Sequence, residues 1–261
     1  MDGSLNEAER PEQYPATVSA SRPVMLSVVI DGRLDGVRAR QVATLVDRLG
    51  LAGVWLRYPW WPLPGAAMSE SELVGLLAEL PSAVQVPLGL LVDAGADATD
   101  LASVKSARPD RLVRVSGDGD AARPPAVFVP CAPGRDLAGE VAAAASAAAG
   151  RPVLAEVTVS VGRTAAEARA RADADELFAL AGHPAEQGLF GTLEECQAAA
   201  ARLAQAGATE LVCYLPLAGD LPDVLAQLRS IAIGAGVLRP GEPPSAAPPP
   251  PSGWGGRRRT A

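Results

Sequence analysis

The chain alternates short, continuously hydrophobic runs with longer segments of helical character, and this alternation constrains the fold more than any other feature. Most runs are rich in β-branched residues and are bracketed by Gly, Pro or Asp, which is typical of strands buried on both faces of a parallel sheet. Seven such runs occur, at residues 24–30, 53–56, 84–92, 111–115, 126–129, 153–161 and 210–214. Seven β–α repeats predict an α/β fold built on a parallel sheet.

Helices are predicted between these runs, the first over about residues 34–50. Three later helices begin at a capping box, in which a hydroxyl and a glutamate three residues further on satisfy first-turn amides: Ser69 with Glu72, Thr164 with Glu167, and Thr192 with Glu195. Gly150 and Gly207 stand where helices are expected to end.

A parallel sheet of this size is either a closed barrel or an open, doubly wound sheet. No G-x-G-x-x-G follows the first strand and no Walker loop occurs, which weakens the usual nucleotide-binding forms of the open sheet. The sequence therefore favours a parallel (β/α) TIM-type barrel, seven-stranded or incompletely closed, over residues 23–236. Residues 1–22 are predicted to be a mobile arm, and residues 237–261 a disordered, proline-rich tail.

Composition and charge exclude several classes of protein. The formal net charge of −7, with no concentrated basic face, argues against nucleic acid as a partner. No apolar run approaches the roughly 20 residues that cross a bilayer, and the acidic start is unlike a secretory signal. The three cysteines, Cys131, Cys196 and Cys213, are too few and too scattered for a disulfide framework or a metal site. A cytoplasmic protein without membrane, nucleic-acid or metal partners is expected.

Two stretches resemble the luciferase-like monooxygenase family. VMLSVVI…VRARQVATLVDRLGLAGVWL, at 24–56, is similar to the opening of the family's barrel. VTVSVGRTAAEARARADAD, at 157–175, and GLFGTLEECQAAAARLAQAGATELVCYLP, at 188–216, are similar to its late strands and helices. With a looser match at 87–117, the resemblance covers about residues 24–233.

This resemblance implies a (β/α) barrel that uses reduced flavin (FMN) or a deazaflavin, and that forms a homodimer or a heterodimer with a related subunit. Two departures weaken the catalytic inference. Where family members carry an acid–His or His–His pair, this chain has RYPWWP at 57–62. The long excursion of full-length members near residues 119–126 is missing, as in a shortened, divergent member. A protein with no cofactor is therefore also consistent with the sequence.

Candidate site residues lie at the carboxyl ends of the predicted strands, where barrel enzymes place their chemistry. Asp31 and Tyr214 are candidates for positioning the substrate, although Asp31 is equally suited to a turn before Gly32. Arg57 offers a planar fork for a phosphate or carboxylate, and the alternative is a salt bridge to Asp31 or Asp93.

Three further positions are candidates for cofactor binding. Trp60, with its neighbour Trp61, would stack on a ring, or else pack against the core or a second subunit. Gly191 and Thr192 open a helix whose free amides suit a phosphate, and simple capping explains the same residues. His183 is the single histidine and is expected in a surface loop. Cys131 and Cys213 are expected to be buried rather than nucleophilic.

The leading hypothesis is a luciferase-like, flavin-dependent oxidoreductase or monooxygenase that acts on a small organic substrate. The first alternative is a catalytically degenerate barrel that serves as partner subunit of a full-length enzyme. The second is a non-redox enzyme that reuses the barrel, because a fold does not fix chemistry.

Overall fold

The computed structural model describes residues 24–58, 68–92, 111–114, 126–132, 134–175, 188–216 and 221–234. The strands are β1 (Met25–Ile30), β2 (Gly53–Tyr58), β3 (Leu88–Val92), β4 (Arg111–Arg114), β5 (Val127–Val129), β6 (Val153–Val161), β7 (Leu189–Gly191) and β8 (Glu210–Tyr214). The helices are α1 (Gly36–Leu49), α2 (Glu70–Ala83), α4 (Leu137–Ala147), α5 (Ala165–Asp173), α7 (Leu193–Ala206) and α8 (Leu221–Gly234). The predicted arm at 1–22 and tail at 237–261 lie outside the described residues.

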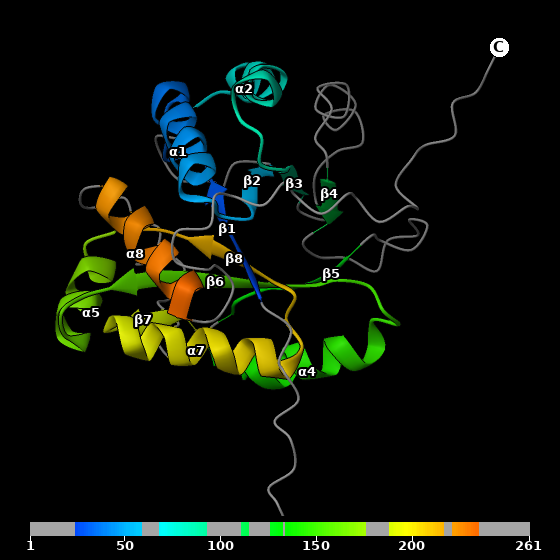
Figure 1. The fold of residues 1–261 in the computed structure, drawn as a ribbon. Helices are drawn as coiled ribbons and strands as arrows, with labels where there is room; N and C mark the ends of the chain where they lie inside the picture. Colours follow the sequence, from blue (N-terminus) through cyan, green and yellow to red (C-terminus); the bar gives the residue numbers. More distant parts are fainter. Residues whose placement is uncertain are drawn as a thin grey trace, which may run out of the picture.

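The sheet is parallel throughout, in the order β4-β3-β2-β1-β8-β6-β5, and β7 pairs with β6 off this path. The last strand, β8, lies beside the first, which is the arrangement of a TIM-type barrel (Figure 1). Within the described strands no pairing joins β4 to β5. The predicted TIM-type barrel is confirmed in its incompletely closed form.

The described part of the sheet has eight strands, one more than the seven predicted. The additional strand is β7, which consists of only Leu189–Gly191 and pairs with the last three residues of β6. Three residues directly before a helix cap are too short to show strand periodicity, so the sequence pattern missed this strand.

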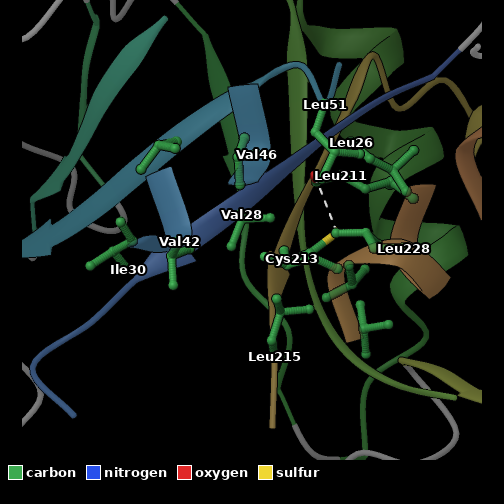
Figure 2. Packing of buried hydrophobic residues seen from close by; sticks show 14 of the residues in the cluster. Leu26, Val28, Ile30, Val42, Val46, Leu51, Leu211, Cys213, Leu215 and Leu228 are labelled. Atoms are coloured by element: carbon green, nitrogen blue, oxygen red, sulfur yellow. Dashed lines mark hydrogen bonds between the residues drawn. The ribbon is translucent and has the colours of Figure 1, made fainter. Parts of the chain in front are cut away.

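The two faces of the sheet bury different side chains. One face packs under the helices: Figure 2 shows Leu26 and Val28 of β1 and Leu211 and Cys213 of β8 near Val42 and Val46 of α1 and Leu228 of α8. Alternate residues form a separate cluster inside the sheet, among them Val29, Trp55, Leu91, Val212 and Tyr214. Burial on both faces explains why the strands read as continuous hydrophobic runs.

The helix ends agree closely with the sequence. Ser69 and Thr192 each form a complete capping box. Thr164 caps α5 as predicted, but the Glu167 carboxylate binds the backbone and side chain of Arg163 instead of closing the box. Gly207 ends α7 at φ 108°, a left-handed conformation that favours glycine. Among the described helices none is long and apolar enough to cross a membrane.

Candidate functional site

The strands carry isolated polar side chains toward the inside of the barrel, on the same face as the interior hydrophobic cluster. They share deep burial, with exposed fractions of 0–8%. These residues are Ser27 on β1, Arg57 on β2, Glu156 and Thr158 on β6, and Glu210 on β8. Burying charge is costly unless it is paired, so their partners determine what the interior can do.

The amino-terminal end of the interior is filled by a cluster around Glu210. Its carboxylate Oε1 accepts hydrogen bonds from Trp55 Nε1 at 2.7 Å and from Ser27 Oγ. The indole of Trp55 fits because β3 carries glycine alongside it: a Cβ on Gly89 would lie 2.2 Å from Trp55 Cε3. This end of the barrel is therefore a packed base, and binding chemistry has to lie nearer the carboxyl ends.

Nearer the carboxyl ends, Arg57 spans the interior. Its Nη1 donates to Glu156 Oε1 at 2.9 Å and to Tyr214 Oη at 2.7 Å, and its guanidinium lies 5.9 Å from the centre of the Tyr214 ring. The other carboxylate oxygen, Glu156 Oε2, accepts from the Cys131 backbone amide at 3.1 Å. The guanidinium and the carboxylate therefore form a buried ion pair of opposite charges.

Arg57 therefore forms a salt bridge, but its partner is Glu156 and not Asp31. The other predicted partner, Asp93, lies outside the described residues. The prediction considered residues at strand ends only, whereas Glu156 stands in the middle of the long strand β6.

Burial raises the pKa of the Tyr214 phenol well above its usual value. The nearby Glu156 carboxylate raises it further, and the Arg57 guanidinium only partly offsets these effects. The phenol is therefore a neutral hydrogen-bond donor over the physiological pH range.

Asp31 is held by Arg33 at the rim of the barrel. Its Oδ1 accepts from Arg33 Nε at 2.8 Å and its Oδ2 from Arg33 Nη2 at 2.7 Å. Arg33 also donates to Asp175 Oδ1 at 2.6 Å and to the Leu215 carbonyl at 3.1 Å. Burial alone would lower the pKa of the Arg33 guanidinium, but the two carboxylates outweigh it and raise that pKa. This geometry gives Asp31 an anchoring role, because both carboxylate oxygens are engaged.

The short helix α5 lies against the carboxyl end of β6. Ser160 Oγ donates to the Ala168 carbonyl at 2.7 Å, and the Arg171 guanidinium donates to the Val161 carbonyl. Ala172 of this helix belongs to the interior cluster. Together with the Arg33–Asp175 pair just beyond its end, these contacts fix α5 over part of the barrel mouth.

The turn at Gly191 and Thr192 is occupied by a carboxylate of its own helix. The Thr192 amide donates to Glu195 Oε2 at 2.8 Å, and the Thr192 side chain accepts from the Glu195 amide. Gly191 has φ 126°, and a Cβ there would lie 2.2 Å from Glu195 Oε2. A phosphate approaching this turn would meet a like charge.

Cys213 is buried, as predicted, whereas Cys131 is only partly buried. Burial, with the Glu156 charge second, raises the pKa of the Cys131 thiol to about 12. Burial also raises the pKa of Cys196 to about 12, and Cys213 donates to the Leu211 carbonyl at 3.5 Å (Figure 2). In the described part of the chain no group of residues could hold a metal ion. Trp60, Trp61 and His183 lie outside the described residues.

Five of the polar residues in and around the barrel interior were not among the predicted site residues: Arg33, Glu156, Thr158, Asp175 and Glu210. For three of these a signal was present: Glu156 and Thr158 interrupt a hydrophobic run at a spacing of two, and Glu210 begins another run. Polar residues at alternate positions of a strand point to the same face, so this spacing could have identified the interior.

A scan against family models finds no match to the chain, and a search of curated proteins finds none. Among solved structures, the monooxygenase RslO1 from Streptomyces bottropensis is similar with a TM-score of 0.52 and 12% sequence identity. The structure of apo-MsnO8 is similar with a TM-score of 0.50 and 18% identity. In each case the match covers 82% of this chain and 98% of the other. At such low identity these matches show a shared fold: the chain has the parallel barrel architecture of RslO1 and MsnO8.

Proposed function

We propose that this protein is an oxidoreductase, of the luciferase-like monooxygenase kind, acting on a small organic substrate. The observation that carries the proposal is the Arg57–Glu156–Tyr214 cluster, which lies toward the carboxyl ends of the strands in a fold shared with a monooxygenase. The sequence blocks at 24–56, 157–175 and 188–216 support the same family.

Within this proposal, Tyr214 positions the substrate and Arg57 positions Tyr214. The Arg57 Nη1 hydrogen bond fixes the phenol oxygen, and Glu156 in turn fixes the guanidinium. Arg57 and Glu156 are therefore positioning residues, whereas Tyr214 would contact the substrate. Asp31 acts at a distance, by holding the rim through Arg33.

A reduced flavin (FMN) or a deazaflavin would supply the electrons in this class of enzyme. The residues predicted to hold its phosphate are engaged by carboxylates of this chain. The Arg57 charge is neutralised by Glu156, and the amide of Thr192 is engaged by Glu195. We therefore assign neither position to a cofactor phosphate, and Trp60 remains a proposed stacking residue.

The pairing of Arg57 with Glu156 and of Thr192 with Glu195 favours a second candidate, a catalytically degenerate barrel that serves as partner subunit of a full-length relative. Such a subunit would keep the barrel fold without needing these residues to bind a cofactor phosphate. We propose a dimer for both functions. An oxidoreductase would pair with a second copy of itself, and a degenerate barrel would pair with a related subunit. Light scattering on the purified chain, alone and with such a subunit, measures the assembly.

Titration of the purified full chain with reduced FMN and with a reduced deazaflavin distinguishes the oxidoreductase from the partner subunit. Anaerobic fluorescence measures binding, and substrate-dependent oxidation of the bound cofactor measures turnover. The oxidoreductase proposal expects saturable binding of one of the two in the micromolar range. If neither binds at several hundred micromolar, the oxidoreductase proposal fails and the partner-subunit candidate takes its place.

A further inference from the structure

Two hydroxyl groups inside the barrel have no acceptor for their hydrogens within the described part of the structure. The Tyr214 oxygen accepts from Arg57, but the structure gives its own hydrogen no acceptor there. Thr158 Oγ1 is buried and makes no hydrogen bond. The two residues have exposed fractions of 4% and 8%. Buried donors are normally satisfied, so a water or a ligand is expected to take these hydrogens.

The two hydroxyls belong to the same interior region. Thr158 of β6 and Tyr214 of β8 are paired across adjacent parallel strands, and both follow the interior alternation of their strands. Phe128 and Phe190 are only partly buried and pack against the interior cluster that contains Tyr214. The surroundings of the two donors are therefore largely apolar and aromatic.

We propose that Tyr214 and Thr158 donate hydrogen bonds to the carbonyl oxygen of a neutral, largely apolar substrate. This inference rests on the proposed function for the identity of the ligand as a substrate. Arg57 is already ion-paired with Glu156, so its guanidinium is not offered to an anionic ligand. A carbonyl oxygen has two lone pairs and no hydrogen, so it accepts from both donors without requiring an acceptor in return.

The raised pKa of Tyr214 agrees with this role, because the phenol keeps its hydrogen over the physiological pH range. The Arg57 hydrogen bond to the phenol oxygen also strengthens the phenol as a donor, since linked hydrogen bonds polarise one another.

Infrared difference spectroscopy on the full chain without flavin tests the proposal. The probe is acetophenone labelled with ¹³C at its carbonyl, titrated into the millimolar range; ethylbenzene, which lacks the acceptor, and benzoate, which is anionic, are the controls. We expect bound acetophenone to show a lowered carbonyl stretching frequency and to bind more tightly than either control.

Tyr214→Phe keeps the ring that packs in the cluster and removes only the hydroxyl. It should abolish most of the frequency shift and weaken binding by roughly three- to ten-fold, the usual value of a neutral hydrogen bond. Thr158→Val should weaken binding by roughly two- to five-fold. Thr44→Val, on the exposed part of α1, is the matched control and should change neither quantity. A thermal melt of each variant verifies that it is folded.

The proposal is overturned if acetophenone binds no better than ethylbenzene, or if its carbonyl frequency is the same in wild type and Tyr214→Phe. Unaltered binding by Thr158→Val removes Thr158 from the site. Because no flavin is present, a carbonyl shift that depends on Tyr214 stands even if the flavin titration fails. If flavin binds but no Tyr214-dependent carbonyl shift is seen, the oxidoreductase proposal stands and the carbonyl site is rejected.

Discussion

The Arg57–Glu156 ion pair predicts a large, specific loss of stability when only one partner is removed. Both side chains have exposed fractions of 9%, so solvent screens their charges little. Arg57→Ala leaves the Glu156 carboxylate buried without its counter-charge, and breaking such a pair costs about 3–5 kcal/mol. For a domain of this size that corresponds to a decrease in Tm of about 6–20 °C.

Urea unfolding followed by circular dichroism measures this free energy, with an unchanged m-value as the sign of unchanged compactness. Arg57→Met with Glu156→Leu in the same chain is the control, because removing both charges should restore most of the stability. Exposed Arg40→Ala, which breaks the surface pair with Glu79, should cost at most about 1 kcal/mol. A loss below about 1 kcal/mol for Arg57→Ala, together with strongly weakened ligand binding, would refute the buried-pair assignment and restore Arg57 as a ligand-binding residue.

Three further outcomes are expected. Gly89→Ala should destabilise the fold by about 1–3 kcal/mol in the same urea assay, because the new methyl group meets the Trp55 indole and overpacks the base; an unchanged free energy would mean that the base is loosely packed. Glu195→Gln should leave reduced-FMN affinity unchanged, since this carboxylate caps its own helix; a several-fold gain in affinity would reassign the turn as a phosphate site. The free energy of unfolding should decrease above about pH 9, because the unfolded state releases protons that Cys131 (pKa about 12) and Tyr214 retain in the folded state. Thermal melts between pH 8 and 11 measure this decrease, and Cys131→Ala should make it less steep.

Local features of the sequence predicted most of the fold. Continuous hydrophobic runs located all strands except the three-residue β7, and hydroxyl–glutamate pairs located the starts of α2, α5 and α7. Both signals lie within a few neighbouring residues, so they survive in the sequence without knowledge of the packing.

The partners inside the barrel could not be predicted in this way. Arg57 and Glu156 are 99 residues apart on strands that are not neighbours, so the curvature of the sheet brings them together. Ser27 and Glu210 are 183 residues apart and meet because β1 and β8 pair with one another. Asp31 shows another partner that the strand pattern did not indicate. Its position after a strand predicted a role in the site, and in the structure both of its carboxylate oxygens accept hydrogen bonds from Arg33.

The interior ion pair also bears on how an incompletely closed barrel keeps its shape. Arg57 lies on β2 and Glu156 on β6, and these strands are separated in the sheet by β1 and β8. Because no ladder joins β4 to β5 in the described strands, backbone pairing alone leaves the curvature between the two halves less determined than in a closed barrel. A side-chain bond through the interior supplies part of that constraint, as does the Trp55 bond to Glu210, which links β2 to β8 across β1. The ion pair thus links β2 to β6 through the interior, beside the uncharged hydroxyls of Tyr214 and Thr158 that we propose as ligand-binding groups.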